Sequence, residues 1–189
     1  MGMPDATRVW TREEVLALPD DGNRYELVDG ELLVSPSPRG IHQRAVLGLY
    51  RIIDPYVRVQ GAGLTMLAPA DLDLGSGQLV QPDLFVVPLL ADGREPLEWP
   101  DFGIPILVVE VTSPSTARYD RITKRYRFQR SGVSEYWIVD TDARTVERWT
   151  PGDTRPEVLD ERISWGPPGA ADQLIIDLAP YFRGAWGEV

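Results

Sequence analysis

The chain of 189 residues contains no cysteine, which excludes a disulfide framework, a thiolate metal site and a cysteine nucleophile. It also lacks any apolar run of about 18 residues, the length that a membrane-spanning helix needs. The first residues, MGMPDATRVW, are polar and do not have the basic-then-apolar layout of a signal peptide. We therefore expect a soluble cytoplasmic protein with no membrane partner.

The chain is also poor in positive charge, with 19 Lys and Arg against 29 Asp and Glu and a net charge of −10. This balance is unfavourable for a nucleic-acid-binding protein, because affinity for DNA rests largely on basic side chains that neutralise phosphates. A local basic face can still bind, since the total charge does not fix the local field. The densest basic stretch supplies six candidates: Arg118, Arg121, Lys124, Arg125, Arg127 and Arg130.

The remaining composition is ordinary, with 43% hydrophobic and 25% charged residues and no internal repeat or low-complexity segment. A chain of this length can form one domain with a sizeable core and is short for two. We predict a single domain over residues 1–189, with its core in about residues 24–149.

The first part of the chain predicts a short helix, a β-hairpin and a longer helix. Thr11 is a candidate N-cap with Glu14 three residues later, which is the pattern of a capping box. Asp29-Gly30 joins two short apolar runs and is a strong hairpin signal. Pro55 is expected to end the longer helix. The predicted ranges are a helix at 11–18, two strands within 24–35 and a helix at about 38–54.

The rest of the chain alternates strands with one further helix. Residues 106–112, ILVVEVT, are almost wholly apolar, as expected for a strand buried on both faces. Residues 88–105 are rich in Pro, Gly and Asp and indicate a surface loop. The order of elements predicts an α/β sandwich with a central mixed sheet flanked by helices and preceded by the hairpin. The other predicted ranges are strands at 63–74, 79–87, 135–140, 145–149 and near 163, a helix at about 119–130, and a strand running into a short helix at 174–182.

Two carboxylates stand out within this pattern. Glu110 lies in the most apolar strand, where an unpaired carboxylate is very costly, so it must be paired, protonated or bound to a cation. A solvent-facing Glu on an edge strand is the alternative. Asp83 follows Pro82 on a preceding strand, where a turn residue is the ordinary interpretation. Acidic residues on neighbouring strands can converge and chelate Mg²⁺, which prefers hard oxygen ligands.

Four segments of the chain carry a family resemblance. They are RYELVDGELLVSPSP followed by HQ, then VQPDLFVV, then VVEVTSPSTARYDRITKRYRFQRSGVSEYWIVD, and finally TVERW, and they extend from about Arg24 to Trp149. On these segments the chain resembles the Uma-type family of restriction endonucleases, a branch of the PD-(D/E)XK nuclease superfamily. The resemblance implies a restriction-endonuclease-like fold and a metal-dependent nuclease that hydrolyses DNA.

The resemblance also implies which residues form the site. Asp83 and Glu110 would bind the metal, Mg²⁺ or alternatively Mn²⁺, and would be catalytic together with Lys124 and His42. The usual lysine of the superfamily would stand two residues after Glu110, where this chain has Thr112, so Lys124 on the following helix would take its place. Lys124 would orient or activate the attacking water, or stabilise the developing charge. His42 would contact the scissile phosphate, position a water or join the outer shell of the metal.

Several of these assignments have a structural alternative. Lys124 reaches the site if Phe128 faces the sheet, and it points into solvent if Tyr126 does. His42 can instead bond the SPSP loop at the start of its helix. Two carboxylates of the hairpin can flank the cleft, although an exposed strand residue is the first interpretation of each: Glu26 and Glu31.

The leading hypothesis is a Mg²⁺-dependent phosphodiesterase that acts on DNA, with basic residues of the stretch 118–130 contacting phosphates. The alternative is a catalytically inactive binding or scaffold module with a nuclease fold, which Thr112, the acidic net charge and the missing DNA-reading domain favour. An RNA or nucleotide substrate is a third hypothesis. By analogy with dimeric restriction enzymes we expect a homodimer, with the apolar tail at 174–182 and three aromatic residues at its contact: Trp149, Trp165 and Trp186.

Overall fold

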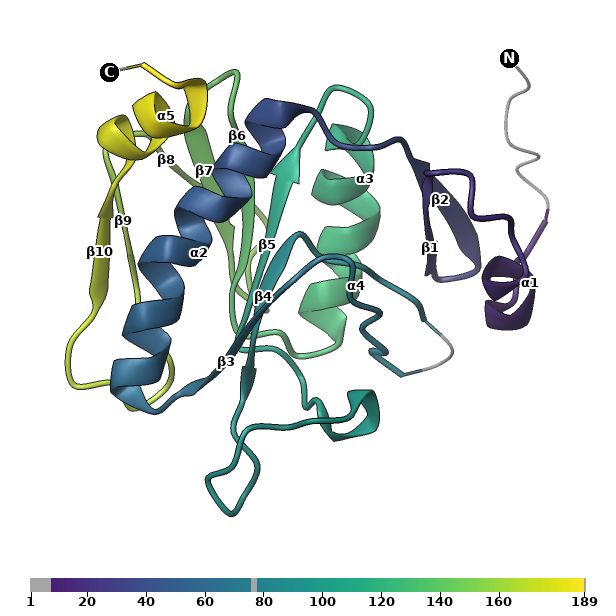
Figure 1. Cartoon of the computed structure of the whole chain (residues 1–189), viewed down its shortest axis with the longest axis horizontal. Coiled ribbons are helices and arrows are strands. Elements are labelled where there is room, and N and C mark those ends of the chain that lie inside the picture. Colours follow the sequence, from purple (N-terminus) through teal and green to yellow (C-terminus); the bar gives the residue numbers. More distant parts are fainter. Residues whose placement is uncertain (1–7, 76–77, 189) are drawn as a thin grey trace.

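A six-stranded mixed sheet lies at the centre of the protein in a computed structural model that describes residues 8–75 and 78–188 (Figure 1). The strands in chain order are β3 (Gly63–Leu67), β4 (Leu84–Pro88), β5 (Leu107–Thr112), β6 (Tyr136–Asp140), β7 (Thr145–Trp149) and β8 (Glu157–Leu159). They lie side by side in this same order, and all neighbours are antiparallel except β5 and β6. The predicted mixed sheet is thereby confirmed.

The central strand β5 is buried along its whole length, as its apolar sequence predicts. It is parallel to β6, so the chain has to cross over between the two strands, and a helical segment makes this crossover. The segment consists of α3 (Ala117–Tyr119), the π-helical turn η2 (Asp120–Lys124) and α4 (Arg125–Arg130). The helix predicted at 119–130 is therefore present, but the π-helical turn within it is not foreseen by the sequence pattern.

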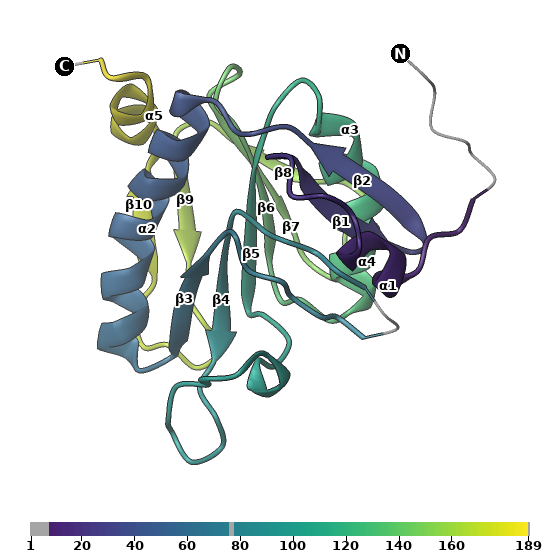
Figure 2. The same ribbon diagram turned by 45° about the vertical axis from the view of Figure 1, so that its right-hand side comes forward.

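Alternating strand residues supply a hydrophobic core on each face of the sheet. The first face is covered by α2 (Gly40–Gln60), the antiparallel pair β9 (Arg162–Trp165) and β10 (Leu174–Asp177), and α5 (Leu178–Trp186) (Figure 2). Val109 of β5 points into this core, whereas Val108 points into the second core together with Phe128 of the crossover helix. The two layers make the α/β sandwich that the order of elements predicts.

The N-terminal elements are α1 (Arg12–Leu16), β1 (Arg24–Val28) and β2 (Glu31–Ser35). α1 begins after Thr11 with the predicted capping box. β1 and β2 form the predicted hairpin, and its turn residues Asp29 and Gly30 both have positive φ, as a tight hairpin turn requires. Asp29 also forms an ion pair of 3.5 Å with Arg127 of α4, which ties the hairpin to the crossover helix.

Helix α2 does not end where the sequence predicts. Pro55 lies inside the helix, which continues to Gln60. A proline has no N–H for the carbonyl four residues earlier, but Ile53 and Val57 are both fully buried against the sheet and hold the helix on it. The prediction that Pro55 ends the helix is therefore wrong. Neither α2 nor any other helix in the described part of the chain is long and apolar enough to cross a membrane.

The two strands predicted at 63–74 and 79–87 are shorter in the structure. β3 ends at Leu67 and β4 begins at Leu84, and the described residues between them form isolated bridges in place of strands. The loop predicted after β4 is present and contains one 3-10 turn, η1 (Trp99–Asp101). The edge strand β8 has no counterpart in the prediction, because two of its three residues are exposed and give no apolar pattern.

The apolar C-terminal segment at 174–182 packs against the core of its own chain. Leu178 and Phe182 of α5 are buried in the core that α2 covers. Trp149 and Trp165 are only 6% and 2% exposed, and Trp186 is the most exposed of the three tryptophans at 42%. Most of the apolar surface that motivated a dimer contact is therefore buried within one chain.

Candidate active site

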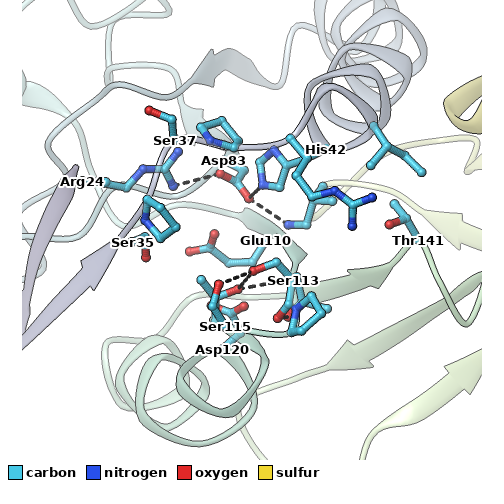
Figure 3. Close-up of a pocket in the computed structure, with 18 of the residues that line it drawn as sticks. Arg24, Ser35, Ser37, His42, Asp83, Glu110, Ser113, Ser115, Asp120 and Thr141 are labelled. Atoms are coloured by element: carbon cyan, nitrogen blue, oxygen red, sulfur yellow. Dashed lines mark hydrogen bonds and ion pairs between the residues drawn. The ribbon is translucent and has the colours of Figure 1, made fainter. Parts of the chain in front are cut away.

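A cavity of about 330 Å³ lies beside the crossover helix, at one edge of the sheet (Figure 3). Because β4 and β5 are antiparallel, the start of β4 and the end of β5 meet at this edge. The first turn of α2, the hairpin and the SPST loop that follows β5 enclose the space between them. Its ionisable lining includes Arg24, His42, Asp83, Glu110, Asp120 and Lys124.

Asp83 lies immediately before β4 and not on a strand as predicted, but it points to the same face of the sheet as Glu110 of β5. Leu84 pairs with Val109, and continuing this register by one residue sets Asp83 opposite Glu110. Residues directly opposite each other in antiparallel strands point to the same face. Both carboxylates line the cavity and are only 3% and 2% exposed. The alternative of a solvent-facing Glu110 is thereby excluded.

Asp83 accepts hydrogen bonds from donors on three elements (Figure 3). Arg24 Nη1 lies 2.9 Å from Oδ1, while His42 Nε2 and the N–H of Val111 each lie 2.9 Å from Oδ2. A carboxylate can only accept, so His42 carries a proton on Nε2 in this arrangement. Burial opposes ionisation of Asp83, but His42, Arg24 and the Val111 N–H outweigh it and lower the pKa of Asp83 below its usual range.

Glu110 is paired with Lys124, whose ammonium lies among three carboxylates. Lys124 Nζ is 2.9 Å from Glu110 Oε1, 2.8 Å from Glu26 Oε2 and 3.8 Å from Asp120 Oδ1. Burial raises the pKa of Glu110 well above its ordinary value, and the charge of Lys124 opposes this only in part. Burial likewise raises the pKa of Asp120. Burial disfavours the charged form of Lys124, but the three carboxylates outweigh it and raise the pKa of Lys124 above its usual value.

The site holds more negative than positive charge. Six charged side chains form two neighbouring groups here: the pair Arg24–Asp83, and Lys124 with Glu26, Glu110 and Asp120. Four are carboxylates and two are cations, so two negative charges lack a counter-charge when all six are ionised and His42 is neutral. Because an unpaired buried charge is costly, the cluster favours either two protonated carboxyls or one additional divalent cation.

The chain contains one lysine and one histidine, and both belong to this site. All other basic residues are arginines. An ammonium is a compact charge with three rotatable donors, whereas a guanidinium is a larger planar fork. The single lysine thus marks the position where the smaller cation fits between three carboxylates. This compositional signal is visible in the sequence and adds to the family resemblance that points to Lys124.

His42 contacts Asp83 and makes no hydrogen bond to the SPSP loop, whose Ser37 bonds Gly22 instead. The role of His42 in the outer shell of a metal stays a prediction. Its other ring nitrogen, Nδ1, is buried and has no hydrogen-bond partner among the described residues. That atom can accept a hydrogen bond from water or substrate.

The hairpin contributes two residues that the sequence interpretation undervalues. Arg24 and Glu26 are two positions apart on β1 and therefore point the same way, toward Asp83 and Lys124 respectively. Glu26 is only 1% exposed, so its interpretation as an exposed strand carboxylate is wrong. Glu31 on β2 is exposed, as that interpretation expects. The sequence signal for the burial of Glu26 is the alternation of side chains along a strand, which sets Glu26 on the same face as Arg24.

The orientation of the crossover helix settles which residues face the sheet. Phe128 is fully buried against Tyr136 of β6, whereas Tyr126 is 54% exposed. Lys124 and Asp120, one and two turns before Phe128, are buried on the same side. The alternative in which Lys124 points into solvent is excluded. The π-helical turn spans these two residues, and π-turns within helices are frequent at functional sites.

The basic stretch of this helix is used mostly for internal contacts. Arg121 pairs with Asp140 and Glu147, and Arg127 donates to the carbonyl groups of Leu74 and Gly75. Arg125 is buried with its guanidinium over the rings of Tyr126 and Trp149. Three exposed arginines near the cavity or on this helix form no ion pair within the described part of the chain: Arg39, Arg118 and Arg130. Few residues of the basic stretch are therefore available to contact phosphates, in contrast to the expectation for the whole stretch.

The donor set at the cavity fits a hard divalent cation. Within residues 8–75 and 78–188, no three His, Asp or Glu side chains converge at metal-ligand spacing. Mg²⁺ is usually bound through one or two carboxylates and keeps several waters, so the two carboxylates Asp83 and Glu110 would suffice to hold it. The surplus of two negative charges has the sign and size that such an ion would neutralise.

The fold and this carboxylate–lysine cluster define a protein of the restriction-endonuclease-like class. The chain belongs to the Uma2 family, described as "Putative restriction endonuclease", whose model matches residues 12–177. The predicted family and fold class are thereby confirmed. The protein is also similar to a solved structure from Anabaena variabilis, described as "a putative nuclease belonging to DUF820". The two chains are 22% identical, the match covers 93% of this chain and 99% of that one, and the TM-score is 0.72. No curated protein matches the sequence. Family membership supports a nuclease function in general.

Proposed function

We propose that this protein is a metal-dependent endonuclease that hydrolyses phosphodiester bonds in DNA, with Asp83 and Glu110 binding one Mg²⁺ or Mn²⁺. The observation that carries the proposal is the surplus of two negative charges in the buried cluster. Family membership and the position of Lys124 beside Glu110 support it further. When bound, a divalent cation would neutralise the phosphate and acidify a water molecule.

The residues of the chain have distinct roles in this proposal. Lys124 donates a hydrogen bond to the attacking water or to a phosphate oxygen on which negative charge develops. Its ammonium stays protonated beside Glu110. His42 orients Asp83 and leaves Nδ1 free to accept a hydrogen bond in the cavity. Arg39 is exposed at the cavity and contributes a phosphate contact.

The test is cleavage of supercoiled plasmid in Mg²⁺ and in Mn²⁺ by the wild type and by Glu110→Gln, which removes a metal-binding charge at constant shape. We expect metal-dependent nicking or linearisation by the wild type and a loss of at least about 10²-fold in the variant. Glu31→Gln removes an exposed carboxylate of the hairpin and serves as the matched control with wild-type activity. Equal cleavage by Glu110→Gln and wild type would falsify the proposed role of Glu110.

A catalytically inactive binding or scaffold module is the second candidate. The observation that favours it is the internal use of Arg121, Arg125 and Arg127, which leaves few free cations for a nucleic acid. This candidate predicts that the wild type cleaves neither DNA nor RNA at any metal concentration. Cleavage of RNA alone would keep the phosphodiesterase and change its substrate.

A further inference from the structure

Arg24 is the partner of Asp83 that can most easily move. Asp83 Oδ2 is held by the N–H of Val111 within the sheet and by His42 at the start of α2. Both donors sit on elements packed into the fold. Asp83 Oδ1 instead pairs with the long flexible side chain of Arg24, which is 21% exposed and lines the cavity.

The position of Arg24 conflicts with metal binding by Asp83. A divalent cation bound to Asp83 would lie close to the guanidinium of Arg24. The two positively charged groups would repel each other strongly in this partly buried site. The donors on Oδ2 keep the carboxylate in place without Arg24. Arg24 is therefore the contact that yields, and it has the open cavity to move into.

A released guanidinium in this cavity has a clear chemical use. Its planar fork matches two oxygens of a phosphate group, and this geometry is a frequent mode of phosphate recognition. We propose that Arg24 is an exchangeable counter-ion, which pairs with Asp83 in the metal-free protein and passes to a phosphate oxygen of the substrate when a divalent cation binds. This inference rests on the proposed function and adds a residue and a sequence of contacts to it.

The exchange makes a prediction that a purely structural role for Arg24 does not. If Arg24 competes with the cation, Arg24→Met binds Mn²⁺ about tenfold more tightly than the wild type, the scale of one lost charged hydrogen bond. If Arg24 only holds Asp83 in position, its removal leaves Mn²⁺ binding unchanged or weaker. Calorimetric titration of the full-length protein with Mn²⁺ alone measures this difference.

Two further variants complete the test. Arg39→Met removes a positive charge from the same cavity without touching a carboxylate, so its Mn²⁺ affinity stays within about twofold of the wild type. Arg24→Gln keeps a donor for the Gln81 carbonyl, which Arg24 also contacts at 3.1 Å, and repeats the test if Arg24→Met is poorly folded. At saturating Mn²⁺, Arg24→Met should cleave plasmid about 10²-fold more slowly, because the phosphate contact is lost.

The outcomes separate the two proposals. Tighter Mn²⁺ binding with slower cleavage supports the exchange. Wild-type Mn²⁺ binding with no gain in either Arg24 variant overturns the exchange and leaves the metal-dependent function in place. Wild-type cleavage by Arg24→Met at saturating Mn²⁺ overturns the phosphate contact. Absence of Mn²⁺ binding in the wild type and in both Arg24 variants overturns the metal-dependent function, and the exchange with it.

Discussion

The only lysine of the chain lies in its most crowded group of charges. Lys124 is 4% exposed and contacts Glu26 and Glu110 at hydrogen-bond distance. Breaking a buried ion pair leaves a buried charge alone, which is far more costly than losing a surface pair. The family resemblance assigns Lys124 a role in the chemistry only. Its burial shows that it also neutralises the interior.

Lys124→Met should therefore affect stability and activity together. We expect the free energy of unfolding to fall by roughly 3–5 kcal/mol, because Glu26 and Glu110 lose their shared cation. Cleavage should fall by at least about 10²-fold, the scale of losing one cationic donor. Denaturant unfolding and plasmid cleavage measure the two effects.

Two variants control this experiment. Lys124→Arg keeps the charge but must fit a larger planar group among three carboxylates, so it should restore part of the stability and little of the cleavage. Arg155→Met removes an exposed cation away from the cavity that has no ion pair within the described residues, and it should change neither quantity by much. A Lys124→Met protein that cleaves as fast as the wild type would show that Lys124 has no role in catalysis.

Among the elements, the hairpin is part of the candidate site. β1 carries Arg24 toward Asp83 and Glu26 toward Lys124, so one strand face supplies a counter-ion to each half of the cluster. Glu26 also accepts a hydrogen bond from the Gln81 N–H through its other oxygen. The hairpin thereby links the segment before β4 to the crossover helix.

Glu26→Gln tests this role without removing the hydrogen bond to Gln81, because the amide oxygen still accepts it. The variant lowers the negative charge of the cluster by one, so Mn²⁺ should bind about tenfold more weakly, and stability should fall by about 1–3 kcal/mol. Glu31→Gln on the neighbouring strand should match the wild type in both calorimetry and thermal unfolding. Unchanged Mn²⁺ affinity in Glu26→Gln would mean that the charge count does not govern metal binding.

The sequence predicts the elements of this fold better than their connections at the site. The apolar run of β5, the Asp29-Gly30 turn and the capping box at Thr11 are local patterns, and each is present as predicted. The pairing of Glu26 with Lys124 joins residues 98 positions apart and depends on how the hairpin packs. Pro55 within α2 likewise depends on burial that no local pattern reports.

The site residues follow the same division. The strand pattern allows Asp83 and Glu110 to converge without requiring it, and the family resemblance selects Asp83, Glu110, Lys124 and His42 as site residues. The π-helical turn and the contact of Arg24 with Asp83 required the structure, because neither leaves a spacing signal in the sequence.

At the scale of the whole molecule, the acidic net charge limits how the protein can hold a nucleic acid. The net charge is −10, and the arginines of the crossover helix are largely engaged in internal contacts. Phosphate contacts must then come from a few residues around the cavity, such as Arg24 and Arg39. A small number of contacts implies weak binding with a shallow dependence on salt concentration.

A homodimer remains a prediction from analogy with enzymes that cut both strands of a duplex. Two of the three tryptophans expected at a dimer contact, Trp149 and Trp165, are buried within the chain and do not support it. Sedimentation equilibrium at micromolar concentration, with and without Mg²⁺ and DNA, measures the mass. A dimer predicts twice the chain mass of 21.2 kDa in at least one condition, and a monomer throughout would contradict it.

The proposed function requires that a buried cluster short of two positive charges binds one divalent cation through Asp83 and Glu110. Counting bound Mn²⁺ by electron paramagnetic resonance tests this most directly, because free and bound ions are distinguished without any need for a substrate. We predict one Mn²⁺ per chain in the wild type and none in Asp83→Asn at concentrations that saturate the wild type. A wild type without bound Mn²⁺, or an Asp83→Asn variant that binds it equally well, would contradict metal binding through Asp83.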